Sequence, residues 1–328
     1  MKLSKVEDSK GPANLHRTLT LEMVRVTERA AIAAAAWRGK GDEKAADEAS
    51  VAAMKAELDR VAISGRIVIG EGEEFECDHL FVGEPAGTGE GPEVDIAVDP
   101  LEGVTACAKN QPDSLVVLAM AERGGLLNVA RNVYMHKIAI GGDYSPETVN
   151  IDWSATENVK ALAEAKGVPI SEITAIVLDR PRHAALIEEL RTAGVAVKLL
   201  SDGDIAGVIH AVNTADTGVD IYLGSGGAPE GVLAAAALRC IGGHMQGKLI
   251  LDTPDKRSRA REMGITDPQR IYDVNALASG DVLFSATGIT DGSLVEGVKL
   301  RRSYVETSTV VMRSWSQTTR WIRARHAR

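Results

Sequence analysis

Hydrophobic side chains recur at helical spacing in the first part of the chain. Between residues 18 and 37 the apolar positions fall three or four residues apart, and Gly39 follows the last of them. A second helix is predicted from about Glu43 to Leu58, so the two helices form a hairpin around Gly39-Lys40-Gly41. Shorter segments rich in β-branched residues then predict strands at 66–69, 94–98, 115–121 and 133–140.

The second part of the chain alternates short apolar runs with amphipathic segments. Strands are predicted at 173–178, 195–200 and 219–223, and helices at 183–191, 205–212 and 229–240. Such alternation is typical of a largely parallel sheet. Two late strands are predicted at 281–285 and 304–312. We therefore expect an α/β protein with two domains, an α+β domain at 1–167 and an α/β domain at 168–328.

Composition narrows the class of function. The 328 residues carry 46 acidic and 37 basic side chains, a net charge of −9, and 4% aromatic residues. An acidic chain repels the phosphate backbone, so we expect no nucleic-acid partner. Arginines near the C-terminus form a basic tail, which we interpret as a solvated terminus rather than an RNA-binding segment: Arg313, Arg320, Arg323, Arg325 and Arg328.

Cysteine spacing and hydropathy indicate the compartment. The three cysteines, Cys77, Cys107 and Cys240, lack CxxC spacing, which argues against a disulfide framework or a zinc knuckle. The first 14 residues are polar, and no apolar run reaches the ~18 residues that a membrane span needs. We therefore expect a soluble, cytoplasmic protein with no membrane partner.

Acidic residues gather where predicted strands end or helices begin, the places where open α/β folds collect ligands. In Asp99-Pro100-Leu101-Glu102-Gly103 the proline ends a strand, so Asp99 and Glu102 can aim two carboxylates at one point. Carboxylates of this kind suit Mg²⁺ or Mn²⁺. A solvated surface turn is the alternative for such a motif taken alone. Further acids stand at comparable places: Asp47, Glu71, Glu73 and Glu230.

Three further motifs could bind anions or sugar hydroxyls. The glycine-rich run at 224–231 joins a strand to a helix and exposes backbone N–H groups, although tight packing alone would also explain it. Arg180-Pro181-Arg182-His183 could clamp a phosphate, or begin a helix with surface arginines. Asp202-Gly203-Asp204 could accept hydrogen bonds from sugar hydroxyls, or form an Asx turn that caps the next helix.

The order of these motifs resembles the class II fructose-1,6-bisphosphatases, within the lithium-sensitive, inositol-monophosphatase-like phosphatases. The matching motifs are IVIGEGE at 67–73, VDIAVDPLEG at 94–103, YMHK at 134–137, RPRH at 180–183, DGD at 202–204 and GGAPEG at 226–231. The resemblance implies a layered αβαβα sandwich of the sugar-phosphatase type. It also implies a metal-binding first half, a substrate-binding second half, and a homodimer or homotetramer.

The resemblance further implies metal-dependent hydrolysis of the 1-phosphate of fructose 1,6-bisphosphate, a gluconeogenic step, with sedoheptulose 1,7-bisphosphate as the second substrate candidate. The implied ligands of Mn²⁺ or Mg²⁺ are Asp47, Glu71, Asp99, Glu102 and Glu230. The implied substrate contacts are Glu102, Gly103, Val104, Tyr134, Arg180, Pro181, Arg182, Asp202, Gly203, Asp204 and Gly227. The residues expected to serve the chemical step are Glu71, Glu73, Asp99 and Thr105.

Two positions depart from the family pattern. Phe75 stands where the family has a catalytically important aspartate, and Val104 where it has a threonine that helps to orient the attacking water. Losing one such group typically costs ~10² to 10⁴ in rate. The neighbours that could substitute are Glu74, Glu76, Asp78 and Thr105. Three readings follow: an active phosphatase, a weakened paralogue that binds sugar phosphate and metal, and a phosphatase with altered substrate choice.

Overall fold

The computed structural model describes residues 15–328, which form helices and strands in mixed order. The helices of this part are α1 (Leu19–Ala35), α2 (Glu43–Leu58), α3 (Val104–Ala108), α4 (Ala155–Lys166), α5 (Ala184–Thr192), α6 (Asp204–Val212), α7 (Thr214–Thr217), α8 (Ala228–Ile241), α9 (Pro254–Glu262) and α10 (Val274–Leu277). The helices predicted near 18–37 and 43–58 are confirmed as α1 and α2, and those of the second half as α5, α6 and α8.

The strands form two mixed sheets. The first has the order β12-β13-β11-β4-β3-β1-β2, with β14 paired to β13. Its strands are β1 (Ser64–Ile69), β2 (Pro85–Ala86), β3 (Glu93–Glu102), β4 (Leu115–Glu122), β11 (Val282–Gly288), β12 (Lys299–Leu300), β13 (Tyr304–Arg313) and β14 (Thr318–Ala327). The second has the order β10-β9-β5-β8-β6-β7. Its strands are β5 (Tyr134–Ile140), β6 (Thr174–Leu178), β7 (Ala196–Leu200), β8 (Ile221–Gly227), β9 (His244–Ile250) and β10 (Ile271–Asp273).

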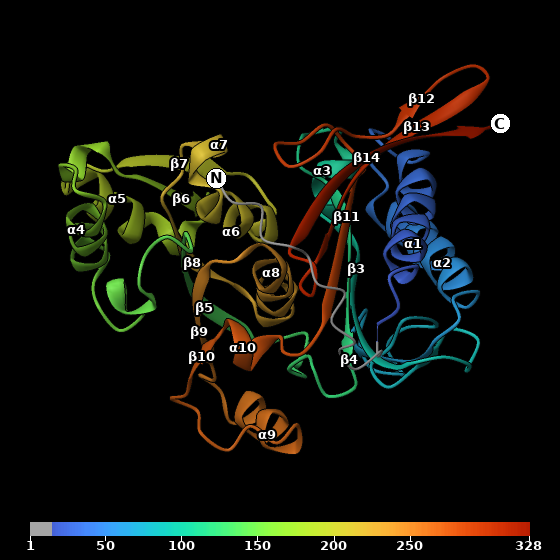
Figure 1. The fold of residues 1–328 in the computed structure, drawn as a ribbon, viewed down its shortest axis with the longest axis horizontal. Helices are drawn as coiled ribbons and strands as arrows, with labels where there is room; N and C mark the ends of the chain where they lie inside the picture. Colours follow the sequence, from blue (N-terminus) through green and yellow to red (C-terminus); the bar gives the residue numbers. More distant parts are fainter. Residues whose placement is uncertain (1–14) are drawn as a thin grey trace.

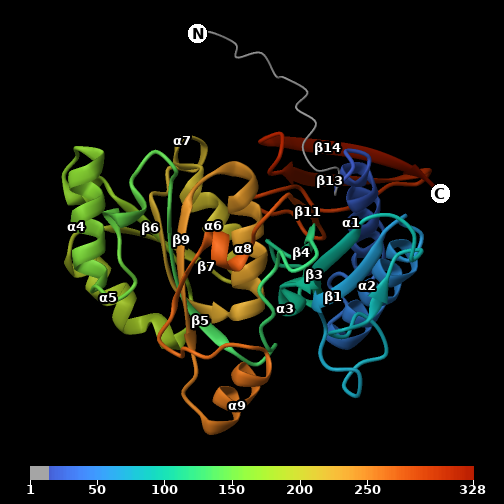
Figure 2. The ribbon, with the colours of Figure 1, turned by 60° about the horizontal axis from the view of Figure 1, so that its bottom comes forward.

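Layers of helix and sheet alternate across the molecule. In Figure 1, α1 and α2 lie on the outer side of the first sheet, while α6 and α8 lie between the two sheets. Helices α4 and α5 cover the far side of the second sheet, and Figure 2 shows the same order after a turn. Each sheet therefore has helices on both faces, and the apolar side chains of both faces are buried against them.

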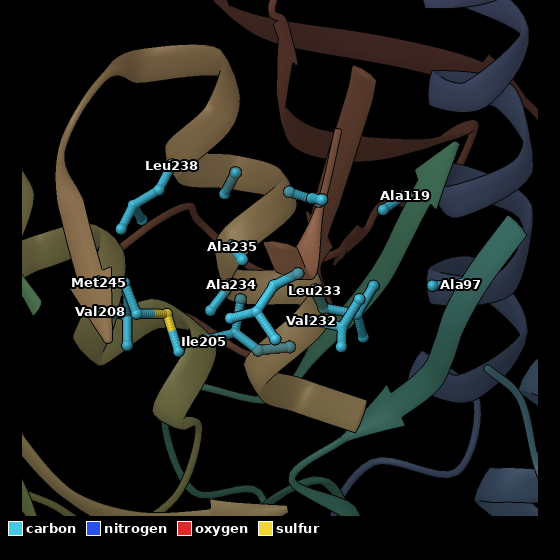
Figure 3. Close-up of a cluster of buried hydrophobic side chains, with 14 of the residues drawn as sticks. Ala97, Ala119, Ile205, Val208, Val232, Leu233, Ala234, Ala235, Leu238 and Met245 are labelled. Atoms are coloured by element: carbon cyan, nitrogen blue, oxygen red, sulfur yellow. The ribbon is translucent and has the colours of Figure 1, made fainter. Parts of the chain in front are cut away.

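Helix α8 is the central packing element. It is rich in alanine, and most of its residues are buried, as expected for a helix enclosed on all sides. Figure 3 shows α8 between strands β3 and β4, which carry Ala97 and Ala119, on one side, and strand β9 with Met245 and helix α6 with Ile205 and Val208 on the other. Small side chains let both sheets approach this helix closely, so its first turn lies where the sheets meet.

The expectation of a largely parallel second sheet is wrong. Strand β6 does pair in parallel with β7 and β8, as strand–helix alternation requires. Strand β5, however, lies between β8 and β9 and runs antiparallel to both. It comes from the preceding part of the chain, so the alternation pattern of the later residues did not reveal its position.

The basic C-terminal segment is a strand rather than a solvated tail. Residues 318–327 form β14, which pairs with β13 along its whole length. Its arginines remain exposed, and two of them pair with acids: Arg323 with Glu296, and Arg325 with Glu306 at 3.0 Å. Alternating exposed arginines conceal the strand because their charge outweighs the period-2 pattern.

The two sheets do not follow the order of the chain. Strands β11 to β14, which come last in sequence, complete the sheet that begins with β1. The division into domains at 1–167 and 168–328 stays a prediction. Within residues 15–328, the helices are all too short or too polar to cross a membrane.

A buried hydroxyl network fastens α1 to the first sheet. The Thr27 hydroxyl lies 3.0 Å from the Ser285 hydroxyl and accepts a hydrogen bond of 2.8 Å from Thr287. Thr287 in turn lies 2.8 Å from the hydroxyl of Thr309 on β13. All four side chains are buried, and the Thr27 hydroxyl, which also donates to the carbonyls of Met23 and Val24, is the partner of the hydroxyls of Ser285 and Thr287.

We expect Thr27→Val to destabilise the fold by about 1–3 kcal/mol, because an isosteric methyl group leaves buried hydroxyls without a partner. Thr27→Ser, which keeps the hydroxyl, is the matched control. The free energy of unfolding should be measured by denaturant titration of both variants. Equal losses for Val and Ser would show that packing, and not the hydroxyl, matters at this position.

Candidate active site

A polar cavity of about 350 Å³ lies where the ends of β3, β6 and β8 meet the beginnings of α3, α6 and α8. It collects all five predicted metal ligands: Asp47, Glu71, Asp99, Glu102 and Glu230. It also collects most of the predicted substrate contacts: Glu102, Gly103, Val104, Tyr134, Arg180, Arg182, Asp202, Gly203, Asp204 and Gly227. Thr105 lines it as well, whereas Pro181 lines a neighbouring cavity and Glu73 lies in the loop after β1.

The end of β3 places two carboxylates in this cavity. The strand was expected to stop before Pro100, but it continues to Glu102 with a shift of register between Asp99 and Glu102. Proline has no N–H to donate and is tolerated at such an irregularity. The hydroxyl of Ser50 donates to the carbonyl of Pro100 at 2.5 Å, and the Ser114 hydroxyl donates to that of Glu102 at 3.1 Å. The irregularity is therefore held on both sides.

The glycines before α8 make room for carboxylates. A Cβ atom on Gly227 would collide with Glu230, and one on Gly226 would collide with Asp204. Side chains at these two positions would therefore push the acids out of the cavity. The glycine-rich run thus has a packing role in addition to the backbone N–H groups that it exposes at the start of α8.

The carboxylates of the cavity raise one another's pKa. Burial, followed by repulsion from nearby acids, raises the pKa of Asp99 and of Glu102 well above the usual range. Burial also raises the pKa of Asp47, Glu71 and Glu230. One oxygen each of Glu102 and Glu230 is buried without a hydrogen-bond partner. This arrangement is costly unless a cation enters.

The donor set therefore fits a hard divalent cation. All five side chains offer carboxylate oxygens, the ligands that Mg²⁺ and Mn²⁺ prefer. Two of these oxygens, one of Glu102 and one of Glu230, have no hydrogen-bond partner and are free to bind a cation. Among residues 15–328, no group of three or more Asp, Glu, Cys or His side chains converges closely enough to hold a metal ion as it stands. A bound ion would have to draw these carboxylates together.

Two basic residues of the site were missed in the sequence. Lys137 is fully buried, forms an ion pair with Asp204 and donates to the carbonyl of Gly227 at 2.8 Å. A lysine within an apolar strand was a signal that could have revealed it. Arg131, in the loop before β5, lies 3.2 Å from Glu71, and nothing in its local sequence indicated this contact.

The motifs at 180–183 and 202–204 meet at the mouth of the cavity. Arg180 pairs with Asp202 at 3.0 Å. Arg182 donates to the carbonyl of Ser225 and lies over the ring of Tyr134. The Asp202 side chain accepts from the N–H of Gly203 but does not cap α6, so the capping alternative for this motif is wrong.

The two unusual positions lie differently. Phe75 is 84% exposed and lines an adjoining cavity of about 700 Å³ together with Glu74, Glu76 and Asp78. Val104 lines the active-site cavity and packs against the apolar side chains between α1, α2 and the first sheet, which form the first core. The hydroxyl of Thr105 donates to Glu43 at 2.7 Å. Each predicted substitute therefore lies outside the active-site cavity or has its hydroxyl directed elsewhere.

Comparison with known proteins gives an extensive match. The family model described as bacterial fructose-1,6-bisphosphatase, glpX-encoded, matches residues 17–326. Relatives named D-fructose 1,6-bisphosphatase class 2/sedoheptulose 1,7-bisphosphatase include one from Synechococcus elongatus, which is 44% identical over 337 aligned positions, 95% of this chain and 97% of its own. Another, from Prochlorococcus marinus, is 44% identical over 326 positions with the same coverage.

We expect metal-stripped protein to lose thermal stability as the pH rises above about 5. The pKa values of these carboxyl groups are raised on folding, so the folded chain binds more protons than the unfolded chain over that range. Added Mn²⁺ should raise the melting temperature, and more at pH 8 than at pH 5. Glu230→Gln should reduce the pH dependence without metal. A melting temperature that is independent of pH in metal-stripped protein would contradict this account.

Proposed function

The chain belongs to the family of bacterial, glpX-encoded fructose-1,6-bisphosphatases, and on that premise we propose that it hydrolyses the 1-phosphate of fructose 1,6-bisphosphate. The observation that carries the proposal is the cavity that brings five carboxylates together with Arg180 and Arg182. Acids alone would repel a phosphate ester. Acids that hold cations, with arginines opposite, form a site for a doubly phosphorylated sugar.

Divalent metal fits the carboxylates of the site. Mg²⁺ or Mn²⁺ would be held by Asp47, Glu71, Asp99, Glu102 and Glu230, where it would supply Lewis-acid stabilisation and an activated water. The family is generally metal-dependent, and which of these ions acts in the cell is part of the proposal. Glu102 is buried, which limits the access of bulk water to its oxygens.

The chain's own residues orient the two phosphates. The reacting phosphate would lie near the first turn of α8, whose N–H groups and dipole favour anions. Lys137 holds the carbonyl of Gly227 and so fixes this turn. The guanidinium groups of Arg180 and Arg182 would bind the distal phosphate. Asp202 and Asp204 would accept hydrogen bonds from sugar hydroxyls.

Finer expectations belong to the same proposal. The observed layers support a sandwich of the sugar-phosphatase type, with metal ligands mainly from the first half and substrate contacts mainly from the second. Relatives whose names include sedoheptulose 1,7-bisphosphatase make that seven-carbon bisphosphate the next substrate to test. A cytoplasmic homodimer or homotetramer is the form in which we propose that the protein works.

The test is phosphate release from fructose 1,6-bisphosphate by metal-stripped protein, with Mn²⁺ or Mg²⁺ added back. We expect turnover that depends on metal, and a loss of about 10²-fold or more in Asp99→Asn, because that residue lies at the centre of the carboxylates. Asp255→Asn, on an exposed helix far from the cavity, is the matched control and should leave turnover unchanged. Turnover without metal, or an unaffected Asp99→Asn, would contradict the proposal.

A second candidate is a weakened paralogue that binds metal and sugar phosphate. The side chains of Phe75 and Val104 favour it, because neither can accept a proton from a water or hydrogen-bond it, and the Thr105 hydroxyl directs its proton to Glu43.

The variant Phe75→Asp/Val104→Thr separates the two candidates. A weakened paralogue should gain about 10²-fold or more in turnover when the two polar groups are supplied. An already competent phosphatase should change by less than about tenfold. Turnover on a panel of phosphate esters, with both sugar bisphosphates included, would reveal the third reading, altered substrate choice.

A further inference from the structure

Arg131 stands at a junction between two cavities. It lies in the loop that connects β4 to β5, and its side chain lines both the active-site cavity and the adjoining cavity that contains Phe75. One guanidinium nitrogen is 3.2 Å from an Oε atom of Glu71, and the arginine side chain is 60% exposed. The contact therefore joins a solvent-facing cation to a largely enclosed carboxylate.

The other basic groups of the active-site cavity have partners elsewhere. Arg180 pairs with Asp202, and Arg182 donates to the carbonyl of Ser225. Lys137, which is buried beside the cavity, pairs with Asp204 and donates to the carbonyl of Gly227. Within residues 15–328, this leaves Arg131 as the basic side chain paired to one of the five proposed metal ligands.

The charge of Arg131 acts on several carboxylates at once. The active-site cavity that Arg131 lines also contains Asp47, Asp99 and Glu230, so its positive charge lies among several of the proposed ligands. One guanidinium group therefore offsets part of the repulsion among the acids that the metal would otherwise neutralise. A divalent cation that enters the site finds the carboxylate of Glu71 already paired with Arg131.

We propose that Arg131 is an internal counter-cation that holds the carboxylates together in the metal-free protein and competes with the divalent cation for Glu71. Metal binding displaces the guanidinium from Glu71. The freed group still faces the active-site cavity, where the anion available to it is the reacting phosphate. Arg131 is thus a positioning residue that exchanges a carboxylate for a phosphate as the site fills.

Loss of Arg131 should affect metal binding and substrate binding in opposite directions. Removal of the guanidinium should tighten metal binding, because a competitor for Glu71 is lost. The same change should raise the KM for the bisphosphate, because a phosphate partner is lost. A residue that merely supported the fold would weaken both metal binding and substrate binding when it was replaced.

The decisive experiment is Mn²⁺ binding to metal-stripped Arg131→Gln, measured by calorimetry without substrate. We expect an affinity about 3- to 10-fold tighter than that of the wild type, a modest gain because the arginine is exposed and solvent screens its charge. Arg325→Gln, which removes an equal charge from an exposed ion pair on β14, is the matched control and should leave the affinity unchanged. Unchanged or weaker Mn²⁺ binding in Arg131→Gln would overturn the inference.

Thermal stability gives a second readout. Metal-stripped Arg131→Gln should melt below the wild type, since its carboxylates have lost their counter-ion, and saturating Mn²⁺ should abolish the difference. Arg131→Lys, which keeps the charge, should recover most of the metal-free stability. A deficit in melting temperature that persists in Mn²⁺ would indicate a structural role and would overturn the inference.

The inference rests on the proposed function for the identity of the metal and the phosphate, but the two can fail separately. Tighter Mn²⁺ binding in Arg131→Gln would uphold the counter-cation role even if no bisphosphate were hydrolysed. Metal-dependent hydrolysis by the wild type, with an unchanged isotherm for Arg131→Gln, would overturn the inference alone.

Discussion

The structure depends on one constraint: five carboxylates lie around one cavity with too little positive charge beside them. Burial together with mutual repulsion opposes the ionisation of Asp99 and Glu102. The surrounding fold must be rigid enough to hold these groups against that repulsion. Two sheets with helices on both faces provide this rigidity, because the acids sit at strand ends and helix beginnings whose backbone is anchored in a core.

Helix α8 links the core to the chemistry. Its alanine-rich body lets the two sheets approach from opposite sides, while its first turn carries Glu230 into the cavity. Gly226 and Gly227 leave space beside the backbone for Asp204 and Glu230. Lys137 then ties the start of α6 to the end of β8 through Asp204 and the carbonyl of Gly227. The proposed substrate contacts and the proposed metal ligand Glu230 thus share one turn of backbone.

The structure shows where the two departures from the family pattern, Phe75 and Val104, lie. Phe75 faces the adjoining cavity and Val104 joins the first core, so the usual proton acceptors are absent from the places where the family has them. Arg131 lies on the wall between the two cavities and is paired with Glu71. The altered loop and Arg131 therefore border the same carboxylates, Asp47 and Glu71, which line both cavities and are proposed as metal ligands.

The sequence by itself determined the local elements and the residue types of the site. Periodicity located α1, α2 and the strand–helix units of the second half, and the acids at 99, 102 and 230 stood out because strand ends and glycine-rich turns are local features. Tertiary structure alone decided which elements became neighbours. The position of β5 between β8 and β9, the return of β11 to β14 to the first sheet, and the contact of Arg131 with Glu71 join residues far apart in the chain. Local pattern carries no information about such pairings, because they follow from the burial of several faces at once.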